Sequence, residues 1–489
     1  MALYLFGIGG TGARVVKALT MLMASGVQLA NTNLVVPILI DPDNANGDLS
    51  RTLELIRLYQ NLRQHTEPGG KQFFHQEIRS LADATGNNTA NAYHFAIDGI
   101  GKDRFKDLLG LSSMSRASQA MTQLLFSDQN LNADMQLGFK GNPNIGSVVL
   151  NRFKDSETFR AFANSFNQED RIVIIGSIFG GTGAAGLPLL LKNLRDAAAS
   201  LPKHELLRNA PIAAISVLPY FDVQEGEQVS IDSKTFVSKT KAALSYYAAN
   251  LCRNNSLNAL YYLGDVVSNT HKGADGAAAQ RNKAHFVELA AAMAIVDFMS
   301  YDRQELLVEQ GRALAPKYFE YGLKEKADPL ISLKHLGARS LDTAGKSLAQ
   351  YFLFQKFFRD YYKTMPGHTA WLKNGNHKLN LEAFNTRTLS DLGRFNDAFD
   401  EWLAEMEQSK TRFKPFNRDL GEKDILNSVV GFPEQHAAWG FLEAKGIDRY
   451  SKILSKQEET LTNAGSSERK LLSLFYLATR ELIKDRIKL

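Results

Sequence analysis

The positions of the apolar residues predict an α/β domain in roughly the first 300 residues. Short apolar runs, each ending near a glycine-rich or acidic turn, are typical of buried strands. They lie at 3–6, 33–40, 171–176, 210–221 and 258–265. After the first run, Val15, Val16 and Leu19 follow at helical spacing. Alternating strands and helices predict a three-layer fold with a parallel sheet in the middle.

Two further patterns set the domain organisation. Residues 283–299 are apolar on nearly every side, which predicts a central helix buried inside the protein. Residues 50–137 are mostly polar and helical in composition, and we expect an insertion that leaves the sheet. The later segments are aromatic and helical, at 347–363, 395–408 and 468–487. We therefore predict an α/β domain over 1–300, with 50–137 as a helical insertion, and a mainly helical domain over 301–489.

Composition narrows the protein class. The 489 residues carry a formal net charge of +5, which gives little attraction for nucleic acid. The single cysteine, Cys252, excludes an intramolecular disulfide and fits a reducing compartment. No apolar stretch is long enough to span a membrane, so we expect a cytoplasmic protein. The histidines lack the spacing of a zinc site, and we expect none.

Three glycine-rich segments carry the chemistry. They are "GIGGTG" at 7–12, "GFKGNPNIGS" at 138–147 and "FGGTGAAG" at 179–186. Each could be an ordinary tight turn, because glycine adopts positive φ without steric cost. Each could also be a phosphate cradle, in which backbone N–H groups and a helix N-terminus face an anion. Three such loops in one α/β domain favour a polyphosphate ligand.

The first loop alone leaves two classes of ligand open. It satisfies G-x-G-x-x-G between a strand and a helix, which is also the dinucleotide-binding pattern of oxidoreductases. In that pattern an acidic residue follows about 20 residues later. Here Asp41, the acidic residue after the second strand, lies farther along. The dinucleotide interpretation also leaves the glycine-rich segments at 138–147 and 179–186 unexplained.

Together the loops resemble those of the tubulin/FtsZ superfamily of GTP-binding proteins. "FGIGGTGARVV" resembles its first phosphate loop, and "LIDPDNANG" resembles the acidic second loop. "GFKGNPNIGS" is similar to the third loop, and "IFGGTGAAG" is similar to the fourth, the glycine-rich loop that characterises the family. The matches run in the family's order over roughly residues 1–300. The resemblance is strongest to tubulin-like proteins of bacteria.

The resemblance implies a set of site residues. GTP or GDP, with Mg²⁺ near the acidic loop, would contact Gly9, Gly10, Thr11, Gly12, Asp41, Asp43, Gly141, Asn142, Gly180, Gly181, Thr182 and Gly183. Glu225 would hold the ribose. Asn282, His285 and Phe286, at the start of the central helix, would meet the base, with Phe286 stacking on it. In the family, an acidic loop beyond this helix completes the site of the next subunit. Asp297 and Asp302, with Glu305, are the candidates for that catalytic role.

The sequence also departs from the family pattern. Phe179 replaces the first glycine of the fourth loop and is expected to narrow the approach to the phosphates. Ala184 lacks the family's hydroxyl, and Val229 stands where the family carries arginine. Three functions remain open: a self-associating GTPase or nucleotide-dependent switch, a scaffold of this fold that hydrolyses nothing, and a dinucleotide-dependent oxidoreductase.

Overall fold

The computed structural model describes most of the chain. The residues it describes are 1–43, 45–66, 70, 72–86, 93–95, 104–135, 139, 142–224, 233–265, 269–272, 281–322, 330–367, 369–374, 377–409, 411–419, 422–430, 446–461 and 465–484. None of the helices in these ranges combines the length and the hydropathy that crossing a bilayer requires.

The centre of the protein is a parallel sheet with the order β12-β8-β6-β5-β1-β2-β3. A short strand, β4, also pairs with β2. The strands are β1 (Ala2–Ile8), β2 (Leu34–Ile40), β3 (Glu77–Ile78), β4 (His94–Phe95), β5 (Arg171–Ser177), β6 (Ile212–Val217), β8 (Ala259–Gly264) and β12 (Lys317–Gly322). Every residue of β1 and β5 is buried, as the apolar runs predict for strands covered on both faces.

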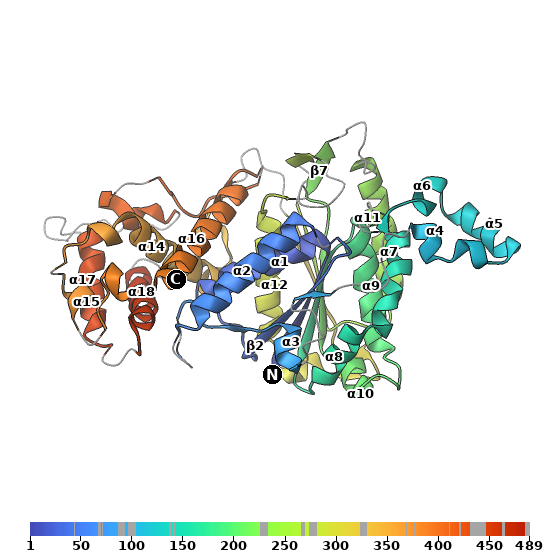
Figure 1. Cartoon of the computed structure of the whole chain (residues 1–489), viewed down its shortest axis with the longest axis horizontal. Helices are drawn as coiled ribbons and strands as arrows, with labels where there is room; N and C mark the ends of the chain where they lie inside the picture. Colours follow the sequence, from blue (N-terminus) through green and yellow to red (C-terminus); the bar gives the residue numbers. More distant parts are fainter. Residues whose placement is uncertain are drawn as a thin grey trace.

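Helices cover both faces of the sheet (Figure 1). One layer contains α1 (Gly9–Ala24), α2 (Gly47–Arg63) and α12 (Phe286–Ser300). The other contains α7 (Pro143–Leu150), α8 (Glu157–Ser165), α9 (Gly181–Arg195) and α10 (His204–Arg208). The predicted three-layer α/β architecture is therefore confirmed.

The buried helix α12 runs from the carboxyl ends of the strands to their amino ends. Its first turn lies near the start of α1, because Asn282 just before it bonds to Asp48 of α2. Its last turn lies at the amino ends of the strands, where Arg171 at the start of β5 donates to the carbonyls of Phe298 and Met299. The helix therefore runs antiparallel to the strands and connects the two ends of the domain.

The segment 50–137 contains more of the sheet domain than its composition predicts. Helix α2 packs on α1, and β3 and β4 extend the sheet beside β2. What leaves the body is a smaller arm, residues 104–135, with α4 (Phe105–Leu108), α5 (Arg116–Leu125) and α6 (Asp128–Leu131) (Figure 1). The sheet also continues past residue 300, because β12 pairs with β8.

The C-terminal part is mainly helical. Its longer helices are α14 (Lys346–Asp360), α16 (Thr386–Glu407), α17 (Gly446–Glu458) and α18 (Ser467–Lys484). Their common core is aromatic: the ring centroids of Phe357 and Tyr450 are 4.5 Å apart, and those of Phe354 and Phe475 are 5.1 Å apart. This part packs on the sheet domain through α16 against α2. A two-stranded ladder, β13 (Leu330–Ile331) with β14 (Arg412–Phe413), accompanies the helices.

Candidate nucleotide site

Two glycine loops meet at the point where the strand order reverses. Strands β1 and β5 are neighbours, and the helices that follow them, α1 and α9, lie on opposite faces of the sheet. A β-carbon built on Gly9 would lie 3.5 Å from Cβ of Thr182 and 3.7 Å from N of Gly183. Open α/β sheets bind their ligands at such a switch point, beyond the carboxyl ends of the strands.

Both helices begin inside these loops without a side-chain cap. Helix α1 starts at Gly9, whose φ of +70° requires glycine, and no side-chain hydrogen bond caps it at Ile8. Helix α9 starts at Gly181, and Gly180 before it provides no side chain to cap it. The first N–H groups of each helix have no intrahelical acceptor, and the helix dipoles add positive potential there. Two such ends side by side favour an anion.

The glycines of the first loop do different work. A β-carbon at Gly12 would lie 2.5 Å from the carbonyl carbon of Gly7, so this position must stay without a side chain to let α1 pack against β1. At Gly10 the nearest atoms to such a carbon belong to side chains: Oδ2 of Asp48 at 3.3 Å and Nη1 of Arg14 at 3.5 Å. Gly12 is therefore structural, whereas Gly10 faces the polar side chains around the loop.

The described part of the third loop lies beside the fourth. Asn142 caps the start of α7 by accepting a hydrogen bond from N of Asn144, at 3.2 Å. Gly146 on α7 approaches α9 so closely that a β-carbon there would be 2.9 Å from O of Gly181. Gly138 and Gly141 lie outside the described residues. The loop is thus placed near the switch point by the packing of α7 on α9.

The acidic second loop is a buried turn after β2. Asp41 accepts from N of Asp43 at 3.0 Å and from Nδ2 of Asn46 at 3.1 Å. Asp43 accepts from N of Ala45, and Asn46 caps α2 by accepting from N of Asp48 at 2.9 Å. Burial raises the pKa of Asp41 to about 7. These carboxylates therefore hold the turn together, and Asp41 carries its negative charge at a cost.

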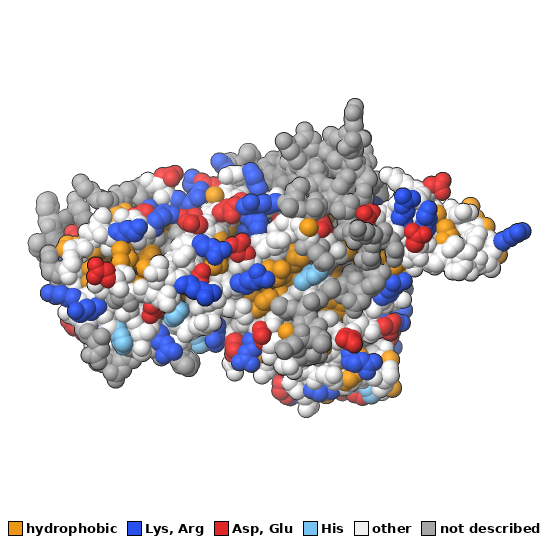
Figure 2. Space-filling model, in the orientation of Figure 1, with side chains coloured by type: hydrophobic (Ala, Val, Ile, Leu, Met, Phe, Trp, Pro, Cys, Tyr) orange, Lys and Arg blue, Asp and Glu red, His pale blue; other side chains and the backbone are white. Residues whose placement is uncertain are grey.

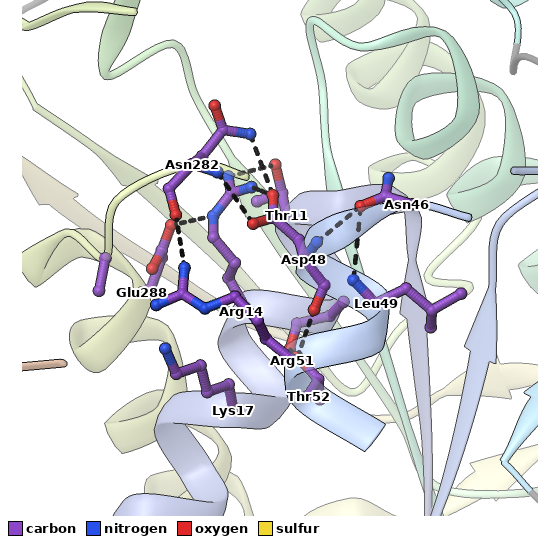
Figure 3. A network of polar contacts seen from close by, with 12 residues as sticks. Thr11, Arg14, Lys17, Asn46, Asp48, Leu49, Arg51, Thr52, Asn282 and Glu288 are labelled. Atoms are coloured by element: carbon purple, nitrogen blue, oxygen red, sulfur yellow. Dashed lines mark hydrogen bonds and ion pairs between the residues drawn. The ribbon is translucent and has the colours of Figure 1, made fainter. Parts of the chain in front are cut away.

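A buried ionic network surrounds Arg14, in the first turns of α1 (Figure 3). Its guanidinium forms an ion pair with Asp48 of α2 and another, at 2.5 Å, with Glu288 of α12. It also donates to the hydroxyl of Tyr220 at 2.7 Å, and that hydroxyl donates to Glu288 at 2.6 Å. Burial by itself would lower the pKa of Arg14, but Tyr220, Asp48 and Glu288 hold it well above its ordinary value. The network ties three helices together next to the first loop.

Asn282 connects this network to the C-terminal part. Its backbone and side-chain nitrogens donate to Asp48, each at 3.0 Å, as Figure 3 shows. Its carbonyl accepts from Arg51 of α2 at 3.2 Å. Arg51 in turn pairs with Glu405 of α16 at 2.7 Å, and Glu405 also accepts from N of Ala284. The segment that enters α12 is thus held from both domains.

Two aromatic side chains occupy places that differ from the sequence expectation. Phe286 is 2% exposed, and its ring centroid lies 5.0 Å from that of Phe413, so it is a core residue rather than an open platform for a base. Phe179 is also buried, with Tyr220 as its aromatic neighbour. Its side chain belongs to the hydrophobic core. His285 begins α12, where its Nδ1 accepts from N of Val287.

The remaining candidates lie elsewhere. Glu225 and Val229 fall outside the described residues. Asp297 and Asp302 lie at the far end of α12. This end is beside the amino ends of the strands, whereas the glycine loops follow their carboxyl ends. Asp297 accepts from the hydroxyl of Tyr261 at 2.8 Å and pairs with Arg339 at 3.0 Å. Asp302 is exposed. Neither carboxylate can reach the phosphate loops of its own chain.

The sequence interpretation missed the residues of the network. Arg14, Asp48, Tyr220 and Glu288 are all buried, and none was singled out. One signal was present: Glu288 is an acidic residue inside an otherwise apolar helix, and Arg14 stands in the apolar stretch after the first loop. Buried charges are paired because an unpaired one is costly, so each predicted an opposite charge nearby.

The strand order, the loops at the switch point and the buried α12 together decide the architecture. The chain has the predicted three-layer α/β fold, with a parallel sheet and a buried central helix. No protein-family model and no curated protein matches the sequence. Solved structures that are similar include the following two. A GTPγS-bound protofilament of CetZ2 from Haloferax volcanii is 14% identical, with a TM-score of 0.31, and the match covers 62% of this chain and 61% of that chain. A two-stranded filament of TubZ-Bt is 12% identical, with a TM-score of 0.27 and coverage of 83% and 79%.

Proposed function

We propose that this protein binds a guanine nucleotide at the switch point and acts as a self-associating GTPase or nucleotide-dependent switch. The observation that carries the proposal is the meeting of the loops after β1 and β5, where two uncapped helix N-termini lie side by side. Backbone N–H groups at these ends would bind the phosphates. Thr11 and Thr182 would add hydroxyl donors.

The donor set also suits a magnesium ion that is held jointly with phosphates. Asp41 and Asp43 offer the carboxylate oxygens that Mg²⁺ prefers. Within the described residues, no cluster of three or more histidine, cysteine or acidic side chains could hold a metal by itself. The remaining ligands would therefore be phosphate oxygens and waters. When bound, the ion would neutralise phosphate charge and relieve the cost of ionising the buried Asp41.

The fold sets a condition on hydrolysis. Asp297 and Asp302 lie at the amino ends of the strands, and the glycine loops lie at the carboxyl ends. These carboxylates would therefore act only on a nucleotide held by a neighbouring subunit stacked along the direction of α12. A carboxylate there would position the attacking water, which is the main task left to protein groups in phosphoryl transfer. The proposal therefore couples turnover to self-association.

One measurement tests the nucleotide class. The purified protein is denatured, and the released small molecules are separated and identified. We expect GTP or GDP in an amount approaching one per chain. Release of a nicotinamide or flavin dinucleotide would support the oxidoreductase alternative, and the guanine-nucleotide proposal would then be wrong.

A scaffold without hydrolysis is the second candidate. It is favoured by the network around Arg14, whose charged groups already satisfy one another, and by Ala184, which has no hydroxyl to offer a phosphate. For this candidate we expect no released nucleotide and no binding of added GTP by calorimetry. Tight binding without turnover would instead indicate a switch.

A further inference from the structure

The arm formed by residues 104–135 presents an apolar helix face to solvent. It projects from the α7–α9 side of the sheet domain, at the end of the molecule opposite the C-terminal part (Figure 1). On α5, Met121 is 60% exposed, Leu124 84% and Leu125 69%. These residues follow the i, i+3, i+4 spacing of one helix face. Figure 2 shows hydrophobic side chains on the surface of this arm.

The polar face of α5 points the other way, toward its own arm. Gln119 donates to the carbonyl of Met114 at 3.1 Å, and Thr122 lies 3.7 Å from the Met114 sulfur. Both side chains are half-buried, whereas no residue of α5 is buried. This is the reverse of an ordinary surface helix, which packs its apolar face inward. A helix of this length gains little stability alone in water. An exposed apolar stripe on it is typical of a surface that binds a partner.

The charges of the arm favour a second copy of this chain. Arg104, Lys106 and Arg116 are balanced by Asp107, Asp128 and Asp134, so two arms do not repel each other. Arg116 begins α5 and Asp128 follows its end, and both are exposed. In an antiparallel pair of α5 helices, each Arg116 would lie near Asp128 of the partner subunit. A membrane surface is disfavoured, because membrane-bound helices carry a polar face rich in lysine and arginine.

We propose that the arm is a self-association surface, in which α5 of one copy packs antiparallel on α5 of a second copy about a two-fold axis. Such a contact is isologous, with Leu124 close to the same residue of the partner. One helix face buries less than a standard interface, so the contact is weak by itself. The arm projects sideways from α12, so this contact would lie beside, and not along, the stacking direction required for hydrolysis between subunits.

Sedimentation velocity of the full chain without nucleotide tests the contact. We expect a monomer–dimer equilibrium with a midpoint of roughly 10–100 μM, as suits a small interface. Leu124→Glu should leave only monomer. Leu314→Glu, at another exposed leucine (53%) beyond the arm, is the matched control and should dimerise normally. A wild-type chain that stays monomeric to about 200 μM would overturn the proposal.

Charge exchange tests the antiparallel geometry. Arg116→Asp should weaken dimerisation at least about fivefold, and the double variant Arg116→Asp/Asp128→Arg should restore it. No rescue would exclude the antiparallel pairing. Because no nucleotide is added, these results do not depend on whether the switch-point site binds GTP. A further experiment is cosedimentation with phosphatidylcholine/phosphatidylserine vesicles. Binding that Leu124→Glu abolishes would assign the apolar face to a membrane and overturn the proposal.

Discussion

Gly10 and Gly12 lie in one loop, yet their surroundings predict opposite effects of the same substitution. Gly10→Val places its side chain beside Asp48 and Arg14, where only side chains must shift. We expect this variant to unfold cooperatively but to lose GTP binding by calorimetry. Gly12→Val collides with the backbone of Gly7, and we expect it to lose about 3 kcal/mol or more of stability. Wild-type affinity in the folded Gly10→Val variant would argue against the phosphate site. Gly181→Val, at the start of α9, tests the other loop in the same way.

Lys17 carries a second prediction at the residue scale. Burial, with the nearby positive charge of Arg51, lowers its pKa from 10.5 to about 8. The charged form is therefore disfavoured in the folded state, and its cost is full below pH 8 and absent above pH 10.5. Lys17→Met should raise the free energy of unfolding near pH 7, by up to about 3 kcal/mol. The gain should shrink between pH 8 and 10.5 in urea titrations. Lys192→Met, on an exposed site of α9, is the control and should show no such trend.

At the scale of elements, α16 is connected to the site by Arg51 and Glu405. Both side chains are mostly buried, at 15% and 12% exposure, so their pairing is worth more than a surface contact. We expect a double-mutant cycle with Arg51→Met and Glu405→Gln to give a coupling energy of about 1 kcal/mol or more in chemical unfolding. Additive effects of the two substitutions would show that the helices are joined by packing alone.

At the scale of the whole molecule, the proposed hydrolysis would require two copies. The glycine loops and the carboxylates of Asp297 and Asp302 lie at opposite ends of α12, and one chain cannot bring them together. GTP turnover per subunit should rise with protein concentration. Asp302→Ala should lower turnover roughly tenfold and leave nucleotide affinity unchanged, because the variant's own loops are intact. A rate per subunit that is constant across a wide concentration range would contradict catalysis between subunits.

Much of the fold follows from the sequence alone. The runs at 33–40 and 171–176 became β2 and β5 because a strand buried on both faces must be apolar throughout. Helix 283–299 is buried along its length because no polar side was available to face water. The loops at 7–12 and 179–186 lie at strand ends because glycine permits the sharp turn into a helix.

Only the tertiary structure decided the rest. Strand order brings the first and fourth loops together although about 170 residues separate them along the chain. It also separates Asp297 and Asp302 from those loops by the length of α12. Phe286 and Phe179 became core residues because the faces on which they lie pack against neighbouring elements, which local spacing does not reveal. The partners of Arg14 come from α2, α12 and the segment after β6, so no local pattern could name them. A buried charge must be paired because an unpaired one is costly in the protein interior, and only the packed fold determines which residues pair with it.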